Sequence, residues 1–268
     1  MMPAALVLAG SRPGAPDGVA LAEGLSHKAL ARIGGETMLA RVIAALRGAG
    51  IERLAVATND EEVAALARAR ECEVIASGTG PSASVAAGFA HFGAPMLVTT
   101  SDHALLEAEW VREFVAAAPG DADVAVLLAR GEAVRAALPG SSRTFLTFAD
   151  GAWSGCNLFL LATPRARAAI ETWSMVEADR KRPWRIAARL GIGTLWRYWR
   201  GRLTLAAALA RLGARIGVVA VPVAARDGLA AVDVDKPRDL ADVRRIVAAR
   251  EADGGAAATC TSSGSGST

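Results

Sequence analysis

The chain has 268 residues, of which 52% are hydrophobic, and this is enough apolar material for one large domain with a sizeable core. Its 30 basic and 27 acidic residues leave a net charge of only +3, and so balanced a charge argues against nucleic acid as a partner. The three cysteines, Cys72, Cys156 and Cys260, are scattered. They indicate neither a disulfide framework nor a zinc cluster, and they fit a reducing cytoplasm.

No stretch of the sequence predicts a membrane span or a signal peptide. A spanning helix needs about 18 or more apolar residues in a row, and the sequence has no such run. The residues Met1-Met2-Pro3 supply no cationic segment before the short apolar run that follows. We therefore interpret that run as a strand.

The first chemical signal is a buried strand that ends at a glycine. Residues 4–9 are all apolar, and the loop that follows begins with Gly10, Ser11 and Arg12 and reaches Lys28. Loop amides of this kind can bind phosphate oxygens. Arginine can donate two hydrogen bonds to one phosphate, and lysine can contribute a compact positive charge. The spacing matches neither GxxxxGK[ST] nor GxGxxG, so an ordinary glycine turn of an α/β domain is the alternative.

Helices and strands alternate through the first half of the chain. In order, the patterns predict helix 38–49, strand 53–57, helix 61–70, strand 73–75, a helix that ends near residue 92, and strand 96–100. Asp60 stands where helix 61–70 needs an N-cap. The alternation predicts a doubly wound, mostly parallel α/β sheet with its site at the carboxyl ends of the strands.

Asp102 is the strongest single candidate for a functional residue in the sequence. It follows directly after the apolar strand 96–100, which places a carboxylate at the predicted edge of the sheet. Mg²⁺ binds to one or two protein carboxylates together with substrate phosphates, so Asp102 is predicted to be a metal ligand. Capping of the next helix is the alternative, although that helix has Glu107 and Glu109 of its own. The neighbouring His103 is interpreted as structural.

A loop of small residues, 77–84, lies at another predicted strand end. Its simplest role is to start the next helix, with Ser82 or Thr79 as the cap. Contact with a nucleotide is the alternative.

The second half of the chain returns to strands. The patterns predict strands 122–129, 144–148 and 155–161, helix 203–212, strand 216–223 and a last helix that opens at Pro237. Asp235 stands where this helix needs an N-cap. A further acidic residue, Asp233, stands two positions before Asp235. Residues 251–268 are mostly Ala, Gly, Ser and Thr, which predicts a disordered tail after a domain over 1–250.

Residues 173–205 differ in composition from the rest of the chain. Four of the six tryptophans fall there among many arginines, and Gly191 and Gly193 divide the segment into two predicted short helices. Such a segment can be an ordinary packed helical pair with a basic rim. It can also be a flap over an anionic acceptor, or a peripheral contact with the inner face of a membrane.

Several separated motifs resemble those of the MobA-like nucleotidyltransferases. They are Leu8-Ala9-Gly10-Ser11-Arg12, Lys28-Ala29-Leu30, residues 33–39, residues 154–159, and the pattern D-x-D-x-P-x-D-L over 233–240. The sequence departs from the family at Ser11, where a second glycine is usual, and in the longer loop before Lys28. The resemblance implies a Rossmann-like, GT-A-type fold in which the Trp/Arg-rich segment is a helical insertion.

The resemblance also implies a reaction: transfer of a nucleoside monophosphate from an NTP to a phosphorylated acceptor, small or lipid-linked, with release of pyrophosphate. The implied nucleotide-binding residues are Leu8, Ala9, Gly10, Ser11, Arg12, Lys28, Gly80 and Ser84. The implied catalytic residues are Lys28, Asp102 and Asp235. The implied acceptor-binding residues are Gly155 and Asn157. Mg²⁺ would be held by Asp102 together with an acidic residue of the closing motif. Asp233 and Asp235 compete for this role; we prefer Asp235 and keep Asp233 as a further contact.

Two other functions stay open. A sugar-nucleotide-dependent glycosyltransferase uses a related fold and an acidic metal motif, but it would not need the triphosphate cradle between Gly10 and Lys28. A regulatory or peripheral-membrane module without chemistry would account for Ser11 and the Trp/Arg segment. The presence of Lys28, Asp102 and Asp235 speaks against such a module.

Overall fold

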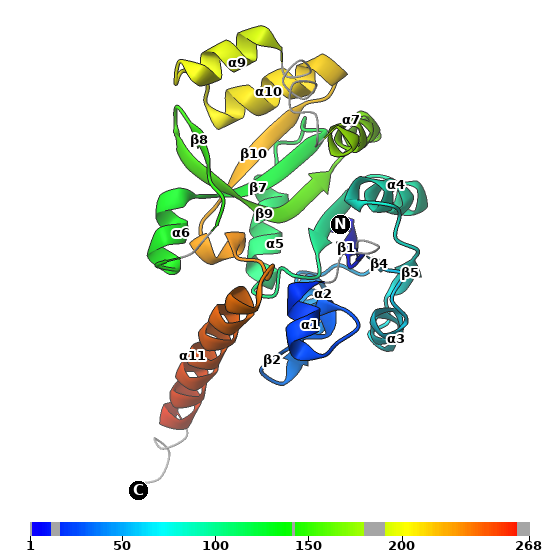
Figure 1. The fold of residues 1–268 in the computed structure, drawn as a ribbon, viewed down its shortest axis with the longest axis vertical. Coiled ribbons are helices and arrows are strands. Elements are labelled where there is room, and N and C mark those ends of the chain that lie inside the picture. The colour runs from blue at the N-terminus through cyan, green and yellow to red at the C-terminus, as the bar shows by residue number, and fades with distance from the viewer. Residues whose placement is uncertain (1, 12–16, 141–142, 180–190, 262–268) are drawn as a thin grey trace, which may run out of the picture.

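One mixed sheet forms the centre of the protein (Figure 1). The computed structural model describes residues 2–11, 17–140, 143–179 and 191–261. The strand order is β10-β7-β9-β6-β1-β4-β5, and β8 pairs with β9 beside this path. The strands are β1 (Ala4–Leu8), β4 (Leu54–Ala57), β5 (Glu73–Ile75), β6 (Met96–Thr100), β7 (Val124–Arg130), β8 (Leu146–Phe148), β9 (Gly151–Leu161) and β10 (Ala220–Ala225). A separate pair joins β2 (Arg32–Ile33) to β3 (Glu36–Thr37).

Most neighbouring strands of this sheet are parallel. β1 is parallel to β4 and β6, β4 to β5, and β7 to β10, whereas β9 is antiparallel to β6, β7 and β8. The strand β9 therefore separates one parallel group, β6-β1-β4-β5, from a second, β7-β10. This arrangement confirms the predicted doubly wound, mostly parallel α/β fold.

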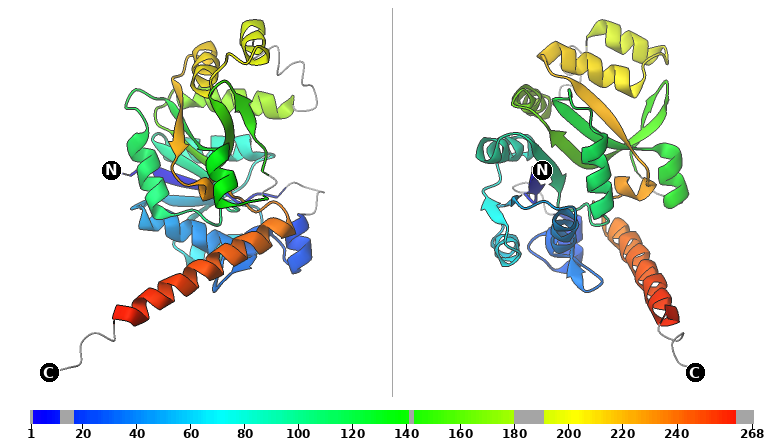
Figure 2. Two further views of the ribbon diagram at one scale, coloured as in Figure 1. Left: turned by 90° about the vertical axis from the view of Figure 1, so that its left-hand side faces the viewer. Right: turned by 180° about the vertical axis from the view of Figure 1, so that it is seen from behind.

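Helices cover both faces of the sheet (Figures 1 and 2). They are α1 (Gly18–Glu23), α2 (Met38–Gly48), α3 (Glu61–Ala69), α4 (Pro81–Phe92), α5 (Ala108–Ala117), α6 (Gly131–Ala137), α7 (Ala166–Ala178), α9 (Ile192–Trp199), α10 (Leu205–Ile216) and α11 (Pro237–Thr261), with short 3₁₀ turns η1 (Lys28–Leu30) and η2 (Gly228–Ala231). Because successive side chains of a strand point to opposite faces, Ala5 and Val7 of β1 join the core under α2 and α5. Leu6 joins the core under α4 and α7. Burial on both faces explains the unbroken apolar run of β1.

Several elements differ from the sequence-based expectation, among them α1, α10 and α11. The short helix α1 was not predicted, and it begins where Asp17 accepts hydrogen bonds from the Val19 and Ala20 backbone amides. Helix α10 continues to Ile216 and ends at Gly217 in a left-handed conformation (φ +73°), so the strand predicted at 216–223 begins only at Ala220. The helix α11 runs to Thr261, so the stretch predicted as a tail begins inside it, and residues 262–268 lie outside the described residues.

The Trp/Arg segment is helical in its described parts. Its first part belongs to α7, and α9 begins after Gly191 (φ +82°). Gly193 lies inside α9 and does not divide it, which corrects that part of the prediction. Residues 180–190, with Trp184, lie outside the described part of the chain. None of the helices described has both the length and the apolar character that crossing a bilayer requires.

Candidate functional site

The site is built where β1 and β6 end side by side. Leu8 pairs with Thr100 in the parallel register, and the Ser101 amide donates to the Leu8 carbonyl at 2.9 Å. The loops that follow the two strands therefore leave the sheet at the same edge. This places the loop of Gly10 and Ser11 next to Asp102, as expected for the carboxyl ends of parallel strands.

A cavity of about 500 Å³ opens at this edge, a size suited to a small-molecule ligand. The predicted site residues that line it are Leu8, Gly10, Ser11, Lys28, Gly80, Ser84, Asp102 and Asp235. Ala9 lies beneath, only 2% exposed, and Arg12 lies outside the described residues. The other three predicted residues, Gly155, Asn157 and Asp233, do not line this cavity. The structure thus brings together most of the predicted nucleotide and metal residues and separates the acceptor residues from them.

Lys28 contacts three carboxylates at the wall of the cavity. Its Nζ lies 2.8 Å from Asp102 Oδ2, 3.3 Å from Asp235 Oδ1 and 3.9 Å from Asp17 Oδ2, and it donates to the Val234 carbonyl at 3.0 Å. The η1 turn holds this position, because His27 caps it by accepting from the Ala29 amide at 3.0 Å. From the sequence, Lys28 sits in a polar loop without an evident buried partner. That expectation is wrong: the side chain is only 16% exposed and touches three carboxylates.

The ammonium of Lys28 is stabilised by its surroundings. Burial acts to lower its pKa, but the charge and hydrogen bond of Asp102, and then the charges of Asp235 and Asp17, outweigh burial and raise the pKa of Lys28. The side chain is therefore a permanent cation at neutral pH. Because three carboxylates surround this one cation, a phosphate would bind beside Lys28 together with a metal cation that offsets their negative charge.

Asp102 and Asp235 are held together although they lie far apart in the sequence. The Val234 amide donates to the Asp102 carbonyl at 3.0 Å, which joins the end of β6 to the segment before α11. Asp239 reaches back and accepts from the amides of Asp235 and Lys236 at 3.1 and 2.8 Å. Asp239, rather than Asp235, therefore supplies the side-chain cap of α11. The Asp235 carboxylate stays available in the cavity, 64% exposed.

The donor set of this cavity fits a divalent cation that is shared with a substrate. Two carboxylates that both contact one ammonium nitrogen, Asp102 and Asp235, are close enough to share one ion. Within the described ranges, no three His, Cys, Asp or Glu side chains form a closed metal cage. An open site with one or two carboxylates is the arrangement in which Mg²⁺ binds together with substrate phosphates.

The loop 77–84 forms the opposite wall of the cavity, and a residue from α7 caps it. Glu177 Oε2 accepts from the Ser82 amide at 3.2 Å and from the Ser82 hydroxyl at 2.6 Å. A Cβ at Gly80 would come within 2.2 Å of Glu177 Oε1, so the approach of this carboxylate requires glycine. The cap of α4 is thus neither Thr79 nor Ser82, and the Ser84 hydroxyl is occupied by the Gly78 amide.

We expect Glu177→Ala to lower the free energy of unfolding by about 1 kcal/mol, because the start of α4 loses its cap. Nucleotide binding should weaken several-fold, because the loop 77–84, which lines the cavity, loses its contact with Glu177. Titration of NTP affinity together with thermal unfolding measures both effects. Glu171→Ala is the matched control, since Glu171 is an exposed residue of the same helix. A loss of stability with unchanged NTP affinity would show that Glu177 only caps the helix.

The predicted acceptor residues form a second cluster beside the first. Asn157 lies at an irregular register between β7 and β9 with φ +48°, and its Nδ2 donates to Asp233 Oδ2 at 2.6 Å. Arg143 forms an ion pair with Asp233 and donates to the Gly155 carbonyl at 3.4 Å. Both oxygens of the Asp233 carboxylate are thus engaged, one by Arg143 and the other by Asn157 of β9, while Asp235 contacts Lys28.

Arg143 of the second cluster is partly buried, with 19% of its side chain exposed. Burial lowers its pKa, and nearby negative charges, among them those of Asp235, Asp239 and Asp102, oppose this shift. His103 follows Asp102 but is 1% exposed, and burial lowers its pKa to about 4. His103 is therefore neutral at physiological pH and is not a general acid, which agrees with its interpretation as structural.

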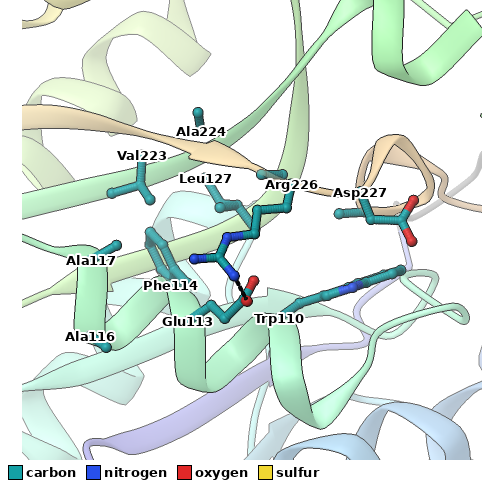
Figure 3. Close-up of a pocket in the computed structure, with 12 residues that line it drawn as sticks. Trp110, Glu113, Phe114, Ala116, Ala117, Leu127, Val223, Ala224, Arg226 and Asp227 are labelled. Atoms are coloured by element: carbon teal, nitrogen blue, oxygen red, sulfur yellow. Dashed lines mark hydrogen bonds and ion pairs between the residues drawn. The ribbon is translucent and has the colours of Figure 1, made fainter.

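A second cavity, of about 330 Å³, lies between α5 and β10 (Figure 3). Figure 3 shows Phe114 of α5 opposite Val223 of β10 and the Trp110 ring below Asp227. Arg226 and Glu113, which also line the cavity, form an ion pair at 2.6 Å. Its lining is mostly apolar, and its arginine is already paired with a carboxylate. The carboxylate of Asp227 also has a partner, since it accepts a hydrogen bond from the Leu229 amide. The charged groups of this cavity are therefore engaged with one another or with the backbone, which makes it a weaker candidate for a metal-bound triphosphate than the cavity at Lys28.

Four residues of the two clusters were not singled out from the sequence: Asp17, Arg143, Glu177 and Asp239. Asp17 precedes an apolar helical stretch, so its capping role was detectable by the N-cap rule. Asp239 belongs to the closing motif and stands at capping-box distance from Lys236. Nothing in the sequence pattern connects Arg143 with Asp233 or Glu177 with Ser82, because these pairs are made only by the tertiary fold.

Comparison with solved structures gives the same fold. A hypothetical transferase from Thermus thermophilus is 31% identical, with 90% of this chain and all of that chain covered and a TM-score of 0.78. A Methanothermobacter nucleotidyl transferase is 19% identical (91% and 96% covered, TM-score 0.56). A CMP:2-keto-3-deoxy-manno-octonic acid synthetase complexed with CTP is 18% identical (92% and 99% covered, TM-score 0.56). The last two likenesses show the fold alone.

The sequence itself matches a family model. No curated protein matches the chain at a significant level, but the model of the MobA-like NTP transferase domain matches residues 5–195. The matched region contains β1, the Lys28 turn, Asp102 and the strand β9. The chain belongs to the MobA-like NTP transferase family.

Proposed function

We propose that the protein transfers a nucleoside monophosphate from an NTP to a phosphorylated acceptor and releases pyrophosphate. The observation that carries the proposal is the contact of one ammonium, Lys28 Nζ, with both Asp102 and Asp235 at the wall of the 500 Å³ cavity. Asp102 follows β6, Lys28 begins η1 and Asp235 precedes α11. Together they supply the cation and the two carboxylates that a triphosphate with its metal ion requires. The family match supports nucleotidyl transfer in general.

The chain's own residues would bind and orient the two substrates. The Gly10 and Ser11 backbone and Lys28 would hold the triphosphate, with the 77–84 loop against the nucleoside. Asp102 and Asp235 would hold Mg²⁺, which when bound neutralises charge on the reacting phosphates. Asp233 would act as a positioning residue instead of a metal ligand, because Arg143 and Asn157 already engage its carboxylate.

In the reaction, an oxygen of the acceptor phosphate would attack the α-phosphorus of the NTP. A new P–O bond forms on one side while the bond to the α,β-bridging oxygen breaks on the other, and pyrophosphate leaves. No general base is required, because a phosphate dianion has no proton to lose. Catalysis would rest on positioning and on charge neutralisation. Asn157 and Gly155 would face the acceptor, which is a small phosphate ester or a lipid-linked phosphate.

Pyrophosphate release tests this proposal. The four NTPs would each be incubated with Mg²⁺ and a panel of phosphorylated acceptors that includes sugar phosphates, alcohol phosphates and lipid-linked phosphates. The expected result is release that depends on both NTP and acceptor. Turnover of sugar nucleotides without pyrophosphate release from any NTP would instead support a glycosyltransferase and overturn the proposal.

A further inference from the structure

The helix α9 and the turn after it expose aromatic side chains to solvent. Every residue from Trp196 to Arg202 is exposed, and the exposed fractions are 51% for Trp196, 46% for Tyr198 and 80% for Trp199. Large apolar side chains that lie together on a surface mark a site of interaction. Figures 1 and 2 show α9 at the outer end of the molecule, beyond α10. We call residues 196–202 the α9 surface.

The α9 surface also carries an unusual concentration of positive charge. The sequence contains no Asp or Glu between Asp179 and Asp227, whereas the whole chain is nearly balanced. Arg197, Arg200 and Arg202 of the α9 surface form no ion pair with a carboxylate among the residues that the structure describes. Arginines without local partners favour an anionic partner from outside the chain.

Aromatic and cationic groups share one side of the helix. Trp196 and Trp199 are separated by three residues, so they lie on one face, and the Arg200 guanidinium stands 4.9 Å from the centre of the Trp196 ring. Tyr198 points instead to β8, where its ring meets Phe148 edge-on at 5.8 Å. That contact anchors α9 to the sheet and leaves the two tryptophans outward.

We propose that the α9 surface docks on an anionic lipid bilayer. Indole rings favour the boundary between water and hydrocarbon, and arginine favours lipid phosphates. A short helix with tryptophans on one side and unpaired arginines beside them lies in the plane of that boundary without crossing it. The absence of carboxylates from residues 180–226 removes the repulsion that an anionic surface would otherwise meet. An anionic bilayer therefore fits the α9 surface better than a neutral partner does.

Membrane docking stands on its own observations. That the membrane also supplies the acceptor is a second step, which rests on the proposed function: docking would present a lipid-linked phosphate to the half of the sheet that holds Asn157. Flotation measures binding without catalysis, so a failure to float leaves nucleotidyl transfer untouched. If the protein floats but releases pyrophosphate only with water-soluble acceptors, membrane docking stands and the lipid-linked acceptor is rejected.

Vesicle flotation tests the proposal. The full chain is mixed with phosphatidylcholine vesicles or with vesicles that contain one third phosphatidylglycerol, at low and at high salt. We expect flotation only with the anionic vesicles and a marked loss at high salt. Arg197→Gln/Arg200→Gln should lower the partition coefficient about 30-fold, because each basic residue near the surface contributes roughly 1 kcal/mol. Arg68→Gln, an exposed arginine on α3, is the matched control and should float normally.

Trp199→Ala separates docking from a role in folding, since the most exposed tryptophan should matter little to stability. We expect unchanged thermal unfolding and at least a tenfold lower partition coefficient. Leu21→Ala, an exposed apolar residue of α1 (66%), serves as its control. Wild-type protein that never floats, that floats equally on neutral vesicles, or whose flotation survives Trp199→Ala contradicts the proposal. A dimer seen by light scattering and abolished by Trp199→Ala would assign the α9 surface to a second copy of the chain and overturn it too.

Discussion

Asp102→Asn should reduce kcat for pyrophosphate release by at least about a thousandfold. Loss of one carboxylate from the site proposed for the metal removes several kcal/mol of transition-state stabilisation, and roughly 4 kcal/mol corresponds to three decades in rate. Asparagine keeps the size of the side chain, and Lys28 keeps its contacts with Asp235 and the Val234 carbonyl. The fold should therefore survive, and steady-state kinetics with thermal unfolding measures both effects.

The control for this variant is Asp121→Asn, which removes an exposed carboxylate that lines neither cavity. It should leave kcat unchanged. If Asp102→Asn retained more than a tenth of wild-type kcat, Asp102 would not be the metal ligand and the site would have to be assigned elsewhere.

Lys28→Met should both raise the KM for NTP and lower the stability of the protein. The variant loses the cation that separates Asp17, Asp102 and Asp235, so three carboxylates remain without their shared partner. We expect the KM for NTP to rise at least a hundredfold and the free energy of unfolding to fall by about 2 kcal/mol, below the range for fully buried pairs because Asp235 is well exposed.

The melting temperature of Lys28→Met in the presence of Mg²⁺ provides a second test of the same variant. Since the Lys28 ammonium contacts both proposed ligands, Mg²⁺ without nucleotide should raise the melting temperature of Lys28→Met more than that of the wild type. Ser26→Ala, in the same turn and exposed, is the control and should behave as wild type. Normal KM and unchanged unfolding in Lys28→Met would show that Lys28 neither binds phosphate nor balances the acids.

The local patterns of the sequence were sufficient to predict the order of the central elements. The apolar run of β1, the cap at Asp60 and the β-branched strand before Asp102 are signals within a few residues, and each was confirmed as an element of the fold. The boundaries of α10 and β10 were placed wrongly. The helical pattern continues past Leu212, and the left-handed Gly217 that stops α10 is visible only in the backbone.

The site was predictable where its residues belong to a motif and unpredictable where the fold joins distant segments. Lys28, Asp102 and Asp235 were selected from three separate patterns, yet nothing in those patterns said that one ammonium would touch both carboxylates. Residues two positions apart on a strand share a face, so the pattern did not predict that Asp233 would contact Arg143 and Asn157 while Asp235 contacts Lys28. Glu177 and Arg143 act through contacts made across the fold, so local patterns could not identify them.

The most direct test of the central claim is a crystal structure of the protein with Mn²⁺ and a non-hydrolysable NTP, with the metal located by its anomalous signal. We expect one metal peak between Asp102 and Asp235, the triphosphate along Gly10 and Ser11, and Lys28 in contact with a phosphate oxygen. A metal bound away from both carboxylates, or a nucleotide seated in the cavity between α5 and β10, would contradict this claim.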